Sequence, residues 1–194
     1  MSLPLSVLPF NESRVYKFDY RSLIPTPPGS LWRIESGLVR SLTWLEDGTI
    51  VALGLWGKGD VVGDYLTKVE PYQVECLTKV EAVSLSLESL HTMGDLLLQH
   101  IQLSEELMVI RSYKRADVML LKLLAWLAKR FGSEVERGQL IDLRLTHQDL
   151  SELLGITRVT ITRLLSQLEQ QGFIQRLSLQ RIILKQEEFW HYEI

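Results

Sequence analysis

The sequence predicts an α+β protein with a β-rich first half and a helical second half. Three observations predict this class. Short runs rich in β-branched and aromatic residues, separated by turn-forming groups, occupy residues 31–87. From about residue 91, apolar residues recur at helical spacing. Between Thr146 and Gln170, two segments with helix-capping residues are joined by Gly155, which is the pattern of a helix-turn-helix.

The composition is that of an ordinary globular protein. The 194 residues are enough for one large domain or two small ones, with 46% hydrophobic and 23% charged residues. No apolar run is long enough to cross a bilayer, and the first residues lack the pattern of a signal peptide. Cys76 is the only cysteine, which excludes an internal disulfide and a CxxC zinc site. We therefore expect a cytoplasmic protein with no membrane partner.

The first half predicts a small barrel or roll, because many short strands follow one another at even spacing. Asp47-Gly48 lies between two of these strands and is a typical hairpin turn. The expected strands are Leu31–Ile34, Leu38–Leu45, Ile50–Leu55, Tyr72–Leu77 and Ala82–Leu87.

Two longer helices follow. The first carries an apolar stripe that can pack on its own domain or pair with a second copy of the chain. The second, Asp117–Phe131, is apolar on most sides and should be buried, with Gly132 at its end. The segment Leu140–Leu145 alternates apolar and charged residues and predicts a short strand. The stripe of the first helix consists of Leu96, Leu103, Leu107 and Ile110.

Charge is distributed unevenly around a net value of −3. Residues 1–110 carry 8 Lys and Arg against 14 Asp and Glu, whereas residues 111–194 carry 13 against 10. Nucleic-acid binding depends on a local basic face rather than on the total charge, so the second half is the candidate.

The helix-turn-helix follows from its caps. Thr146 with Asp149 three residues later predicts a helix start, and Thr157 predicts a second one. Gly155 permits the left-handed backbone of a tight turn between the two helices. Two short strands, Phe173–Arg176 and Arg181–Lys185, would then form a wing beside the second helix.

The second helix has one apolar and one polar face at about 100° per residue. The polar face bears Arg158, Val159, Thr162 and Arg163 near the helix start and has no carboxylate. Arginine binds guanine bidentately, and an apolar group can touch the thymine methyl, so this face predicts base reading in the major groove. The competing interpretation is a solvated amphipathic helix with no DNA contact.

The stretch Gly155-Ile156-Thr157-Arg158-Val159-Thr160-Ile161-Thr162-Arg163-Leu164-Leu165 resembles the DNA-binding signature of the Crp/Fnr family, and most closely its cyanobacterial nitrogen-control (NtcA) branch. The resemblance is strong over Arg115–Leu184, moderate over Leu31–Gly63 and weak before Leu31. It implies a cyclic-nucleotide-binding-like β-roll over residues 1–90, a dimerisation helix within 91–113 (about Gly94–Tyr113) and a winged helix-turn-helix over 114–194.

The resemblance also implies roles for individual residues. Arg158 and Arg163 match base-reading arginines, and Val159 replaces a glutamate of the cyclic-AMP receptor branch. We therefore expect a homodimer on double-stranded DNA at a palindromic GTA…TAC-like site, with RNA polymerase as a further partner. Positions that match phosphate contacts are Thr146, Gln148, Thr157 and Thr160.

The sensor half departs from the family pattern. Gly63-Asp64-Tyr65 stands where the cyclic-nucleotide cassette has a Gly-Glu pair, and no arginine lies between Arg40 and Arg111. A phosphate would find only Lys58, Lys68 and Lys79, without a bidentate partner. We expect no cyclic-nucleotide binding and no cofactor, and the effector stays unknown.

Three alternatives remain open. A constitutive regulator without effector is one, and a sensor of haem or 2-oxoglutarate within the same family is another, with His91 or His100 as the haem ligand. A cupin-like enzyme is the third, but its metal needs a histidine cluster in the β-region. The four histidines, His91, His100, His147 and His191, all lie outside that region, so we expect no catalytic or metal site and no enzyme.

Overall fold

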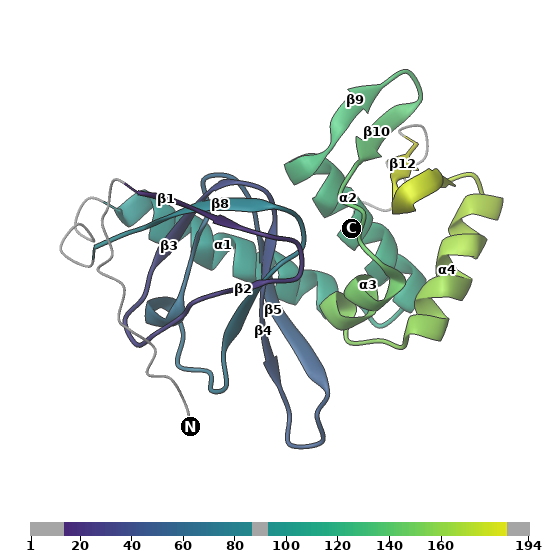
Figure 1. Cartoon of the computed structure of the whole chain (residues 1–194). Helices are drawn as coiled ribbons and strands as arrows, with labels where there is room; N and C mark the ends of the chain where they lie inside the picture. The colour runs from purple at the N-terminus through teal and green to yellow at the C-terminus, as the bar shows by residue number, and fades with distance from the viewer. Residues whose placement is uncertain (1–13, 87–92, 186–194) are drawn as a thin grey trace. The chain divides into compact units, whose positions relative to one another are not determined.

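The computed structural model describes residues 14–86 and 93–185, and the chain divides into two compact units (Figure 1). One unit combines Met1–Thr43 with Leu55–Ile101. The other combines Trp44–Gly54 with Gln102–Ile194. The tip of one β-hairpin therefore groups with the carboxy-terminal half of the chain.

Strands β1–β8 form two four-stranded sheets, in the orders β1-β8-β3-β6 and β2-β7-β4-β5. The pairs β1–β8, β3–β8, β3–β6, β2–β7 and β4–β7 all run antiparallel. This is the predicted β-rich half, with three short strands that the sequence pattern did not reveal: β1, β2 and β6. The strand bounds are β1 Val15–Phe18, β2 Leu23–Ile24, β3 Trp32–Ser36, β4 Val39–Trp44, β5 Ile50–Trp56, β6 Val61–Val62, β7 Gln73–Cys76 and β8 Val80–Ser84, with a short 3-10 helix at Asp64–Leu66.

Two tryptophans lie in the core of the sheets, and each has a hydrogen-bond partner for its indole nitrogen. Trp32 donates to the Pro25 carbonyl oxygen at 2.8 Å, and Trp56 donates to Ser41 Oγ at 2.9 Å. The Trp56 ring also stacks on the His100 imidazole, with ring centroids 4.1 Å apart. These bonds allow large amphipathic rings to be fully buried without an unsatisfied donor.

Helix α1 (Gly94–Arg111) has two opposite apolar faces. Leu107 and Ile110 are buried and Leu96 and Leu103 are half-buried, so the predicted stripe packs on its own chain. A second stripe, on the other side of the helix, consists of large apolar side chains that are 53–69% exposed. At about 100° per residue its members fall within one third of the helix circumference. They are Leu98, Ile101, Met108 and Val109.

The carboxy-terminal unit is built on α2 (Ala116–Phe131), which packs against α4, β10 and β12. The sheet of this unit has the strand order β11-β12-β10-β9. Burial of each leucine side chain in the unit contributes about 1.5–3 kcal/mol to the stability of the fold. The remaining elements are β9 Ser133–Val135, β10 Gly138–Ile141, α3 His147–Leu154, α4 Arg158–Gln170, β11 Ile174–Arg176, a 3-10 turn at Ser178–Gln180 and β12 Ile182–Leu184.

Two expected strands are displaced along the chain. The expected strand Ala82–Leu87 is instead β8, Val80–Ser84, and its expected end, Leu87, lies outside the described residues. The expected strand Leu140–Leu145 is instead β10, Gly138–Ile141, which pairs with β9 and β12. Alternation continues to Leu145, but Arg144 adopts a positive φ of 51°, which turns the chain toward α3. The predicted wing strands are confirmed as the antiparallel pair β11 and β12.

No helix among residues 14–86 and 93–185 has the length and apolarity needed to cross a membrane.

Candidate nucleic-acid interface

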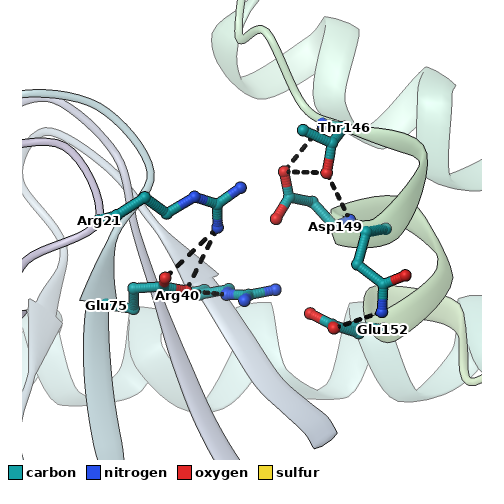
Figure 2. Close-up of polar contacts among 7 residues, drawn as sticks. Arg21, Arg40, Glu75, Thr146, Asp149 and Glu152 are labelled. Carbon is teal, nitrogen blue, oxygen red and sulfur yellow. Dashed lines mark hydrogen bonds and ion pairs between the residues drawn. The ribbon is translucent and has the colours of Figure 1, made fainter.

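Helix α3 begins with the predicted capping box (Figure 2). Asp149 Oδ2 accepts hydrogen bonds from the Thr146 backbone N–H at 2.8 Å and from the Thr146 hydroxyl at 2.7 Å. In return, Thr146 Oγ1 accepts from the Asp149 N–H at 3.0 Å. Asp149 is 2% exposed, so this network fixes the start of the helix in a dry environment.

The turn between the helices also follows the sequence. Gly155 adopts the left-handed conformation, with φ 68° and ψ 30°, and its N–H donates to the Ser151 carbonyl oxygen. Thr157 then caps α4, because its Oγ1 accepts from the Thr160 N–H at 3.1 Å. The two hydroxyl oxygens of Thr157 and Thr160 lie 2.9 Å apart. The two helices are therefore set by local bonds at both starts.

Helix α4 presents the predicted faces. Its leucine side is buried, with Ile161 and Leu165 at most 1% exposed. On the other side Arg158, Thr162 and Arg163 are exposed, and Val159 is 79% exposed. An exposed valine side chain does not stabilise the fold by burial. Neither arginine forms an ion pair within the part of the chain that the structure describes. This surface is available to a ligand.

The four candidate phosphate-binding residues differ in their bonds. Gln148 is exposed and donates one amide N–H to Glu152 Oε1 at 2.6 Å, which leaves the other amide hydrogen outside this bond. Thr157 and Thr160 lie at the start of α4, where backbone N–H groups attract anions. Thr146 uses its only hydroxyl hydrogen on Asp149, so a phosphate contact would require that bond to break.

Sequence reasoning missed His147, the first residue of α3. Its Nδ1 lies 2.8 Å from Thr162 Oγ1, which brings the start of α3 onto the base-reading candidate face of α4. Burial and the charges of Arg176 and Arg158 lower the pKa of His147 below its usual value. Only the packing of α3 across α4 brings the two residues together, so the spacing of 15 residues gave no signal.

Two wing arginines were also missed as candidate site residues. Arg176 forms an ion pair with Glu169 of α4 at 2.6 Å, and its backbone N–H donates to the same carboxylate at 2.8 Å. These bonds hold the wing against the helix and lower the pKa of Glu169. Arg181 donates to the Ser178 carbonyl oxygen at 3.2 Å, and Leu179 at the wing tip is 60% exposed.

Arg111, the last residue of α1, links three elements of the carboxy-terminal unit. Its Nε donates to the Leu153 carbonyl oxygen of α3 at 2.6 Å, and its Nη2 donates to the Ala52 carbonyl oxygen of β5. Burial lowers the pKa of this guanidinium. Arg111 is half-buried, and helical spacing gave no sign of its bond to Ala52 in the β4–β5 hairpin.

The segment expected to depart from the cyclic-nucleotide cassette lies in the β-rich half of the chain. Lys58, Lys68 and Lys79 are all exposed. Asp64 Oδ2 accepts from the Gly29 backbone N–H at 2.9 Å, so this carboxylate supports a loop. Tyr72 is half-buried, and burial raises the pKa of its hydroxyl. In the second sheet, the carboxylate of Glu75 binds Arg40 at 2.6 Å and Arg21 at 3.4 Å (Figure 2).

The contacts of His100 and the arrangement of possible metal ligands bear on the haem and enzyme alternatives. His100 Nδ1 lies 3.0 Å from the Val61 carbonyl oxygen, while its ring stacks on Trp56, and burial lowers its pKa. His91 and His191 lie outside the described residues. Within residues 14–86 and 93–185, no group of three His, Cys, Asp or Glu side chains is placed to hold a metal ion.

Known proteins are similar to this chain in sequence and in fold. Residues 119–189 match the Crp-like helix-turn-helix domain. The chain is 45% identical over 159 residues to the regulatory protein CysR of Synechococcus elongatus, covering 80% of this chain and 77% of that protein. It is 26% identical over 188 residues to the global nitrogen regulator of the same organism, covering 89% and 82%. In fold, it is similar to a crystal structure of a CRP-family transcriptional regulator from Thermus thermophilus, with a TM-score of 0.74 at 21% identity, covering 88% of this chain and 92% of that chain.

Proposed function

This chain belongs to the Crp/Fnr family of transcription regulators, and we propose that it binds a palindromic GTA…TAC-like DNA site as a homodimer. The observation that carries this proposal is the face of α4 that bears two exposed arginines and an exposed valine. The cytoplasmic setting and the contact with RNA polymerase expected from the sequence belong to the same proposal.

The base-reading face would use four side chains. Arg158 and Arg163 supply bidentate donors for guanine, and Val159 supplies an apolar contact for a thymine methyl. Thr162 completes the face with a hydroxyl. A glutamate at position 159 would instead accept from cytosine, so valine favours a half-site with thymine after guanine. This chemistry agrees with GTA.

Backbone phosphates would bind around the two helix starts. Gln148 and Thr157 are exposed there and carry donors that a phosphate oxygen can use. Thr160 lies beside Thr157 and would share that phosphate. For Thr146 the capping box competes with phosphate binding, so its main contribution is to hold α3 in place.

The exposed stripe of α1 supports the homodimer. Leu98, Ile101, Met108 and Val109 leave an apolar surface on a helix whose opposite side is already packed. A second copy of the same helix would bury these side chains about a two-fold axis. Two α4 helices related in this way would read half-sites about one helical turn, roughly 34 Å, apart.

The proposal includes no cyclic nucleotide. Trp56 is buried in the roll and Tyr72 is half-buried, and the three lysines near the expected sensor segment are exposed to solvent. A phosphate placed in this roll would therefore lack a buried cationic partner from the sensor segment.

Selection of binding sites from random duplexes tests the proposal. We expect enrichment of paired GTA and TAC half-sites, and a complex whose mass corresponds to two chains per duplex. The same selection with Arg158→Ala should lose preference at one position of each half-site. Enrichment of single half-sites, or of no sequence at all, would contradict the homodimer or the assigned reading face respectively.

A further inference from the structure

His147 lies where three elements of the proposed DNA interface meet: α3, α4 and the wing. It lines a cavity of about 420 Å³ together with Glu169 of α4 and Arg176 and Arg181 of the wing. We propose that His147 is a positioning residue, which fixes the side chain of Thr162 on the base-reading candidate face of α4 and takes up a proton when DNA binds. This inference rests on the proposed function.

The hydrogen bonds define what the imidazole does. A threonine hydroxyl has one hydrogen, and Thr162 Oγ1 donates it to the Arg158 carbonyl oxygen at 3.0 Å. Thr162 Oγ1 must then accept from His147, so Nδ1 carries a hydrogen in both the neutral and the charged ring. Protonation adds a hydrogen at Nε2 and leaves the bond to Thr162 intact. The charged ring therefore positions Thr162 as well as the neutral ring does.

Burial and the charges around His147 lower the pKa of its ring in the absence of DNA. Arg158 of α4 and Arg176 of the wing both oppose a further positive charge, and Arg181 lies in the same cavity. The one carboxylate among the described residues that line the cavity, Glu169, is already occupied by Arg176 through bonds of 2.6–2.8 Å. Together with burial, these charges place the pKa of free His147 below its usual value.

DNA reverses this balance. A phosphate beside the wing and the start of α3 brings negative charge within reach of the arginines and of His147. The pKa of His147 must then be higher in the complex than in the free protein. By linkage, the DNA affinity must increase as the pH falls through the window between these two pKa values. Each unit by which DNA raises this pKa gives up to about tenfold tighter binding per subunit at low pH.

The test measures affinity for the selected site by fluorescence anisotropy between pH 5.5 and 8 at constant ionic strength. His147→Asn keeps a donor for Thr162 but has no proton to gain, so its affinity should stay the same from pH 8 to pH 5.5, whereas the native affinity rises over that range. His147→Ala removes both properties and should bind severalfold more weakly at every pH. His100→Asn is the matched control, because it removes the other described imidazole, and it should keep the native pH dependence.

A second measurement needs no variant. The histidine proton resonances of the native chain, followed by NMR, should give a higher pKa for His147 in the complex than in the free protein. An unchanged pKa, or a His147→Asn variant that keeps the native pH dependence, would overturn the inference while leaving sequence-specific binding intact. If the native chain fails to bind any selected duplex, the proposed function itself fails.

Discussion

Replacement of Arg111 with methionine removes two hydrogen bonds that connect α1 with α3 and with the β4–β5 hairpin. Methionine matches the length of the arginine stem, so packing changes little. The Leu153 and Ala52 carbonyl oxygens lose a charged donor. We therefore expect the variant to unfold more easily.

The size of the effect follows from two opposing contributions. A hydrogen bond from a charged donor contributes about 1.5–3 kcal/mol, so two of them contribute roughly 3–6 kcal/mol. Against this stands the cost of taking the guanidinium out of water, which also lowers the pKa of Arg111. We expect the bonds to prevail, with a net loss of about 2–3 kcal/mol in the free energy of unfolding.

Urea denaturation followed by circular dichroism measures this loss as a lower midpoint at unchanged slope. Arg111→Lys keeps the charge but lacks the planar fork, so it should lose roughly half as much. Arg137→Met is the matched control, because Arg137 is exposed and its replacement should unfold at the native midpoint. A native midpoint for Arg111→Met would refute the stabilising role of this guanidinium.

Four further substitutions test the interface and the dimer. Arg158→Ala should reduce the free energy of binding to the selected site by roughly 1–3 kcal/mol and relax the base preference at one position of each half-site. If the affinity falls equally for all duplexes, Arg158 contacts a phosphate instead. Val159→Glu should shift selection away from GTA half-sites, and unchanged selection would contradict the contact with thymine. Met108→Glu puts a charge on the exposed stripe of α1 and should yield monomers in sedimentation velocity; persistent dimers would exclude this stripe as the contact. Thr157→Ala removes the cap of α4 and should lower the free energy of unfolding by about 1 kcal/mol, a loss that Thr157→Ser should largely avoid.

Local chemistry explains why the helix-turn-helix could be predicted closely. The caps at Thr146 and Thr157 and the left-handed Gly155 depend on neighbouring residues, so the sequence reveals them directly. The two faces of α4 follow from one helical period. Even the exposure of Val159, unusual for its residue type, was expected from that period.

Features that depend on packing between distant segments could not be predicted. The bond between His147 and Thr162 needs the crossing of α3 over α4, and the burial of Arg111 needs the β4–β5 hairpin. The apolar stripe of α1 was expected either to pack within the chain or to pair with a second copy, and it packs within the chain. The second apolar face of α1 becomes evident only when the burial of each side chain is known. Strands of two residues, such as β2 and β6, are too short to show alternation.

Pairing through the exposed stripe of α1 would make activity depend steeply on dosage. If Leu98, Ile101, Met108 and Val109 must meet a second copy before DNA is bound, the active species forms by a bimolecular step. Below the dissociation constant of the dimer, its amount rises with the square of the chain's concentration. While most copies of the promoter are still unbound, a twofold rise in synthesis would then give about a fourfold rise in promoter occupancy, so a regulator without an effector would respond sharply to its own abundance.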